Sequence, residues 1–85
     1  MKLKSDLVLR QIADTWVVLP LSKDTLDFDG MLTLNESGAF LWQALQEGKD
    51  LVEALTSEYD VGRQQAAADV EEFLEALRAK GCFAE

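Results

Sequence analysis

The spacing of apolar residues divides the chain into two halves that meet at Leu34-Asn35. Before this junction, apolar residues form short runs separated by turn-forming residues, which is typical of strands. After it, they recur every three or four positions, which is typical of helices. Asn35 is a strong helix N-cap, and Leu34 and Ala39 hold the two positions of a hydrophobic staple. We therefore expect a strand to end at Leu34 and a helix to begin directly after Asn35.

The first half predicts a hairpin of two strands. Residues 7–12 alternate in the way of a half-buried strand, and residues 16–19 are rich in branched and aromatic side chains. Asp14-Thr15 lies between them and predicts a tight turn. Pro20 has no amide donor, so the second strand should end there or lie open at that point.

A third strand is predicted at residues 31–34. Leu34 must face the core if it staples the helix, which places Leu32 on the same face and turns Met31 and Thr33 the other way. Three strands form a small antiparallel sheet with two edges. A short apolar edge strand has free amides and carbonyls that can pair with an incoming strand.

Three helices are predicted after the junction. The first spans about 36–47 and stops at Gly48, the second follows the N-cap Asp50, and the third spans about 63–80. Because the helices follow the strands instead of alternating with them, the predicted class is α+β, with a winged-helix-like order of three strands and three helices. The inward residues predicted from the spacing are Gly38, Leu41, Trp42, Leu45, Val52, Leu55, Tyr59, Ala66, Val70, Phe73, Leu74 and Leu77, with Leu51 flanking.

Two glycines have predicted structural roles. Gly38 falls in the first turn of a helix, where glycine is unfavourable, so we expect another backbone to pass too close for a side chain. Gly81 suits the residue after the third helix, in a Schellman arrangement that brings Cys82 against Leu77. Cys82 is then a small buried apolar residue.

Composition argues against an enzyme. The chain has 85 residues, enough for one domain over residues 1–85, and it contains no histidine and one cysteine. This excludes a disulfide framework, a Cys/His zinc site and the histidine-dependent nucleophile pairs. We predict no catalytic residue, metal or cofactor. No apolar run reaches the ~18 residues of a membrane helix, and no signal-peptide core follows Met1-Lys2, so a cytoplasmic location without membrane contact is expected.

The net charge of −8 bears on partners. An acidic chain suits a basic partner and is repelled by phosphate backbones. The order of elements also fits a winged-helix DNA-binding regulator, but the exposed middle of the third helix carries Asp69, Glu71, Glu72 and Glu75 where a recognition helix presents Arg, Asn or Gln. We therefore expect no nucleic-acid binding, and the regulator remains an alternative.

What remains is a binding module. The third strand offers an edge, and the small residues Ala66-Ala67-Ala68 could leave a shallow groove beside it, although alanine is also a good helix former. Strand pairing alone is too weak for micromolar affinity, so side-chain pockets must contribute. The candidate peptide-binding residues are Met31, Leu32, Thr33, Leu34, Arg63, Gln64, Ala67, Ala68 and Glu71.

The segment Leu34-Asn35-Glu36-Ser37-Gly38-Ala39, with Leu41-Trp42 and Leu45 after it, resembles the LNxTGAxIWxLL signature of the PqqD family. The ordered landmarks Gly48, Asp69-Val70, Phe73-Leu74, Leu77 and Gly81 extend the resemblance over nearly the whole chain. Ser37 stands where threonine is usual.

The resemblance implies a recognition element for ribosomally made, modified peptides, as in the peptide chaperone of pyrroloquinoline quinone (PQQ) biosynthesis. A leader peptide would add to the third strand, lie against the third helix and be presented to a maturase, often a radical S-adenosylmethionine enzyme. The implied surface is residues 31–34 with the outer side of residues 63–75. An adaptor that binds only the enzyme remains a further alternative, and an edge that accepts a peptide could also pair with a second copy to form a homodimer.

Overall fold

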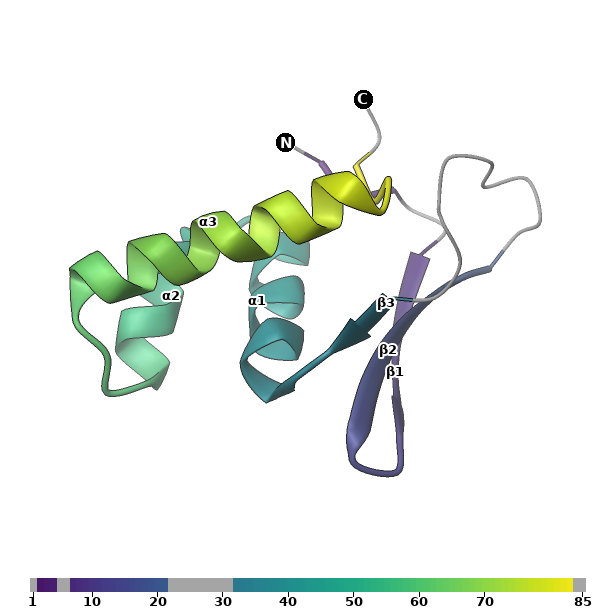
Figure 1. The fold of residues 1–85 in the computed structure, drawn as a ribbon, viewed down its shortest axis with the longest axis horizontal. Helices are drawn as coiled ribbons and strands as arrows, with labels where there is room; N and C mark the ends of the chain where they lie inside the picture. The colour runs from purple at the N-terminus through teal and green to yellow at the C-terminus, as the bar shows by residue number, and fades with distance from the viewer. Residues whose placement is uncertain (1, 5–6, 22–31, 84–85) are drawn as a thin grey trace.

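The computed structural model describes residues 2–4, 7–21 and 32–83. Three strands are followed by three helices, which confirms the predicted α+β class (Figure 1). The elements are β1 (Leu7–Ile12), β2 (Thr15–Pro20), β3 (Leu32–Leu34), α1 (Glu36–Gln46), α2 (Leu51–Glu58) and α3 (Arg63–Ala79).

The strands form one antiparallel sheet in the order β1-β2-β3. Among the described residues, the short strand β3 pairs with the first part of β2, through Trp16↔Leu34, Val17↔Thr33 and Val18↔Leu32. Pro20 pairs with Leu7 of β1 and lies beyond the residues of β2 that pair with β3. Its missing amide hydrogen therefore removes no hydrogen bond between β2 and β3. Leu32 and Leu34 are buried and Thr33 is exposed, which confirms the predicted faces of β3.

The turn between β1 and β2 lies one residue earlier than predicted. Ile12 pairs with Thr15, so the two turn residues are Ala13 and Asp14, and Thr15 opens β2. The β-branched Thr15 suits a strand better than a turn. Ala13 takes a positive φ of 57°, a left-handed conformation that glycine adopts at lower cost.

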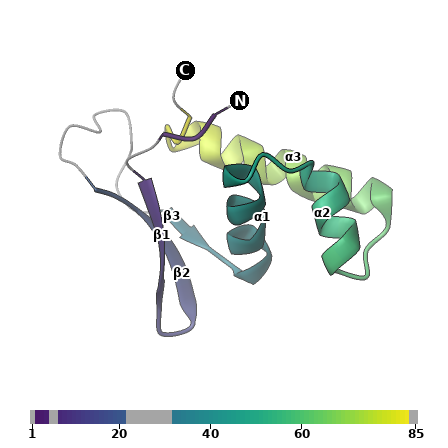
Figure 2. The same cartoon turned by 180° about the vertical axis from the view of Figure 1, so that it is seen from behind.

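The core is centred on α1, which lies between the sheet and α2, while α3 crosses over the helical half (Figures 1 and 2). The largest fully buried side chains are Trp42, Leu77, Val18 and Cys82. In α2 the residue predicted to flank the core, Leu51, is buried with Leu55, whereas Val52 is only half-buried. The predicted inner residues Val52 and Tyr59 pack against the core while partly exposed, and Leu51 at the start of α2 is more deeply buried than predicted.

The helix starts follow the sequence signals. The Asn35 Oδ1 accepts a 2.8 Å hydrogen bond from the Gly38 amide, and the Asp50 Oδ1 accepts one of 3.1 Å from the Glu53 amide. A Cβ on Gly38 would lie 3.1 Å from the Asn35 Oδ1 and 3.3 Å from the Leu34 Cβ. The space is therefore restricted by the side chains of Leu34 and Asn35, four and three residues earlier. The prediction that another backbone passes close to Gly38 was wrong.

Both predicted glycine stops are Schellman motifs. Gly48 and Gly81 each have a φ of 75°. The Cys82 amide donates to the Leu77 carbonyl at 3.0 Å, and Cys82 is fully buried as predicted. The Lys4 amide donates to the Cys82 carbonyl at 2.9 Å, so the segment before β1 is fastened to the end of α3.

Candidate functional site

A cavity of about 540 Å³ lies beside β3. Its walls come from β3, the start of α1, the end of α2 with the following turn, and the middle of α3. Apolar atoms form slightly more than half of its surface, and polar groups from β3, the start of α1 and α3 form the rest. The lining residues are Thr33, Leu34, Asn35, Ser37, Gly38, Leu41, Leu55, Tyr59, Val61, Asp69, Glu72, Phe73 and Ala76.

The cavity adjoins an unpaired strand edge. In the described part of the chain β3 pairs with β2 on one side and with no strand on the other. A strand added to that edge would place every second side chain on the face of Leu32 and Leu34, toward the helices. The arrangement can therefore combine backbone pairing at β3 with side-chain binding in the cavity.

The α3 wall repeats at helical spacing. Asp69, Glu72, Phe73 and Ala76 stand at positions i, i+3, i+4 and i+7, which is one face of the helix. Phe73, one turn after Asp69 and next to Glu72 in the sequence, adds apolar surface to the same wall. Asp69 accepts a 2.9 Å hydrogen bond from the Gln65 side chain, which lies one turn earlier.

Negative charge also lies near the opposite wall. Burial, and then the nearby carboxylates of Glu36 and Glu58, raise the pKa of the Tyr59 hydroxyl. The Tyr59 ring meets Phe40 edge to face, with 5.6 Å between the ring centroids. Among the described residues that line the cavity there is no lysine or arginine. The cavity therefore combines an apolar surface with acidic surroundings.

The structure brings only part of the predicted residue set to this cavity. Thr33 and Leu34 line it, whereas Leu32 is packed in the core. Met31 lies outside the described residues. The other predicted residues of α3 are exposed but do not line the cavity, and a role for them in binding stays a prediction; they are Arg63, Gln64, Ala67, Ala68 and Glu71.

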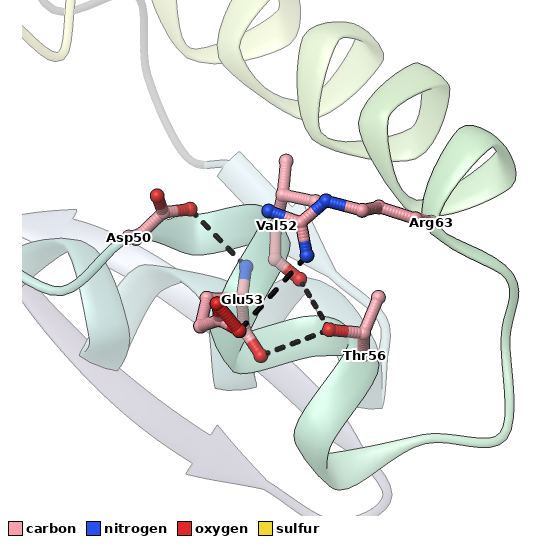
Figure 3. A network of polar contacts seen from close by, with 5 residues as sticks. All are labelled: Asp50, Val52, Glu53, Thr56 and Arg63. Carbon is pink, nitrogen blue, oxygen red and sulfur yellow. Dashed lines mark hydrogen bonds and ion pairs between the residues drawn. The ribbon is translucent and has the colours of Figure 1, made fainter.

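Arg63 is directed toward α2. Figure 3 shows its side chain extending from the start of α3 toward Glu53, with 3.9 Å between the charged atoms. Both side chains are largely exposed, so the pair contributes little stability. The Glu53 amide also donates the cap hydrogen bond to the Asp50 carboxylate, and the Glu53 carbonyl accepts a hydrogen bond from the Thr56 hydroxyl (Figure 3). This network joins the starts of α2 and α3.

The sequence alone placed Phe73 in the core. It included Asp69 and Glu72 only within the implied surface of residues 63–75, and it did not single out Asp69, Glu72 or Ala76 as individual site residues. Their i, i+3, i+4, i+7 spacing was the available signal. It could not be used because the spacing gives the face of a helix without showing whether β3 and α2 leave part of that face open. Phe73 belongs to the core and to the cavity wall: its side chain is packed in the core cluster with 8% of its surface exposed, and it also lines the cavity.

The described residues contain no group of three His, Cys, Asp or Glu side chains arranged to hold a metal ion. Burial raises the pKa of the Cys82 thiol to about 11, and the lysines Lys4 and Lys80 offset this only partly. The thiol is therefore protonated at neutral pH. Within the same residues, no helix is both long and apolar enough to span a bilayer.

The sequence model for coenzyme PQQ synthesis protein D matches residues 15–82. The chain belongs to the PqqD family. The match begins in β2 and ends at Cys82, so it includes every residue that lines the cavity. No curated protein matches the chain.

Two solved structures resemble this chain over nearly its whole length. TbiB1, solved in complex with the TbiA(beta) leader peptide, is 31% identical with a TM-score of 0.76, and the alignment covers 98% of this chain and 94% of TbiB1. Lasso peptide synthetase B1, solved with its leader peptide, is 24% identical with a TM-score of 0.76, covering 99% and 96% of the two chains. The likeness to lasso peptide synthetase B1 shows a shared fold and no more.

Proposed function

We propose that this PqqD-family domain binds the leader of a ribosomally made precursor peptide and presents it to a modifying enzyme. The leader adds to the free edge of β3 as a fourth strand and places side chains in the adjoining cavity. One observation carries the proposal: among the described residues β3 has one unpaired edge, and that strand borders a cavity walled by α3. That TbiB1, a relative of similar length and fold, was solved with a leader peptide supports it.

The energetics require both parts of the site. The strand β3 has three residues. Two or three added backbone bonds at about 0.5–1.5 kcal/mol each fall short of the roughly 8 kcal/mol of micromolar binding. Each apolar side chain buried in the cavity adds about 1.5–3 kcal/mol. The leader therefore needs at least two apolar side chains on the face that enters the cavity.

The domain acts by tethering and carries out no chemistry itself. Binding the leader raises the local concentration of the attached core peptide at the enzyme, which favours modification without any contact to the reacting atoms. The enzyme is of the radical S-adenosylmethionine type, and the product is PQQ or another modified peptide.

Filling the cavity tests this proposal. Ala76 is exposed at the cavity wall, so Ala76→Trp should fold normally and occupy the leader's place. The probes are synthetic peptides encoded by the short reading frames beside the gene, with affinity measured by calorimetry. We expect a loss of at least about tenfold, or ~1.4 kcal/mol, for the peptide that binds.

The matched control is Ala67→Trp. Ala67 is an exposed alanine of the same helix, about two and a half turns away and so on the opposite side. It should leave affinity unchanged. If Ala67→Trp weakens binding and Ala76→Trp does not, the peptide lies on the α3 surface predicted from the sequence and not in the cavity.

A further inference from the structure

We propose that the acidic side of the cavity selects a leader segment with a lysine or arginine two residues from an apolar residue, both on the side of the bound strand that faces α3. The inference rests on the proposed function and specifies its substrate class. It assigns Asp69 and Glu72 as residues that determine specificity.

The first support is the composition of the α3 wall. Asp69 and Glu72 are one turn apart on the face that lines the cavity, with Phe73 beside them. A lysine or arginine side chain matches this surface, because its methylene stem can lie on the aromatic ring while its charge reaches the carboxylates. An aspartate or glutamate at that position would meet like charge.

The second support is the absence of a competing cation at this wall. In the part of the chain that the structure describes, Arg63 pairs with Glu53 and Arg78 pairs with Glu75, and none of these four residues lines the cavity. Asp69 has the neutral Gln65 amide as its hydrogen-bond donor. A cation on the peptide therefore displaces no ion pair that the described residues form at this wall.

The third support is the extent of the charge. The Tyr59 hydroxyl on the opposite wall lies in the field of Glu36 and Glu58, and the whole chain carries a net charge of −8. A field of one sign over a groove attracts a segment of the opposite sign and speeds its association. The local and the overall charge favour the same kind of leader.

The spacing follows from strand geometry. Successive side chains of a strand alternate between its two faces, so residues two apart point to the same side and lie about 6.6–6.8 Å from each other. One such position can fill the apolar part of the cavity while the next reaches Asp69 and Glu72. Charge on the alternate positions, which face away from the helices, should have little effect.

Selection from a random peptide display library on the full-length domain tests this inference. Bound sequences should be enriched in Lys or Arg two positions from an apolar residue. With Glu72→Lys the preference should shift toward Asp or Glu, and a lysine peptide selected on the wild type should bind about three- to tenfold more weakly. Glu75→Lys is the control, because it makes the same charge change at an exposed residue of the same helix that does not line the cavity and is not a candidate binding residue.

The outcomes separate the two proposals. Selected peptides that compete with a native precursor but show no preference for Lys or Arg overturn this inference and leave leader binding in place. An equal loss of affinity with Glu75→Lys and Glu72→Lys also overturns it, since only the overall charge would then matter. If neither the library nor any native precursor yields a binding peptide, the proposed function fails, and this inference fails with it.

Discussion

At the scale of single residues, Asn35 determines how the sheet joins the helices. Its Oδ1 accepts hydrogen bonds from the Gly38 amide at 2.8 Å and from the Ser37 hydroxyl at 3.2 Å. The same oxygen and the Leu34 side chain occupy the space where a Cβ of Gly38 would lie. The family motif around Asn35 is thus explained by local packing at the start of α1, and two of its residues, Leu34 and Asn35, also border the cavity.

Substitutions of the N-cap Asn35 should lower stability only when the new side chain cannot accept the hydrogen bond of the Gly38 amide. Asn35→Ala removes the oxygen that accepts the Gly38 amide and should cost about 1 kcal/mol of unfolding free energy. Asn35→Asp keeps an acceptor and places negative charge at the helix N-terminus, so it should unfold at nearly the wild-type urea concentration. Equal destabilisation by both substitutions would show that the cap bond is unimportant.

Cys82 should make stability depend on alkaline pH. Its pKa in the folded protein is about 11 against an ordinary value of 9.0, because burial disfavours the thiolate. Between these two pH values, unfolding releases the thiol proton. The stability that the buried, protonated thiol contributes is therefore fully present below about pH 9 and is lost as the pH rises toward 11. Urea midpoints of the wild type should fall faster across this range than those of Cys82→Ala, and parallel curves would contradict the assignment.

At the scale of elements, the turn of the β1–β2 hairpin holds a non-glycine residue in an unfavourable backbone conformation. Ala13 has a φ of 57° in a two-residue turn, where glycine is the favoured residue. Ala13→Gly should therefore stabilise the domain by about 1 kcal/mol, raising the melting temperature by roughly 4–8 °C.

The neighbouring residue provides the control for this change. Asp14 is not among the described residues with positive φ, so Asp14→Gly gains no such relief and adds freedom to the unfolded chain. It should lower the melting temperature. The turn geometry would be wrong if the two glycine variants behaved alike.

The elements themselves could be predicted where local signals were strong. Asn35, Gly48 and Gly81 predicted helix ends because capping depends on neighbouring residues only. The hairpin turn was misplaced by one residue because neither Ala13 nor Asp14 is glycine. The cavity wall of α3 could not be predicted, because the exposure of Asp69 and Glu72 toward β3 depends on how the sheet packs against the helices.

At the scale of the whole molecule, charge and shape favour a peptide over a nucleic acid. The net charge of −8 opposes the phosphate contacts on which DNA binding depends. The third helix, which would be the recognition helix of a winged-helix regulator, presents Asp69 and Glu72 to the cavity. The edge of β3 that no other described strand pairs with matches an extended peptide segment in its hydrogen-bonding groups.

The most direct test is an amide chemical-shift titration of the domain with the short peptides encoded beside its gene. The account predicts that one peptide shifts the amides of β3 together with those of Tyr59, Val61 and the Asp69 to Ala76 face of α3, and that the β3 amides become protected from exchange. A bound peptide that instead shifted only the opposite face of α3, around Ala67, and left β3 unchanged would contradict strand addition at this edge.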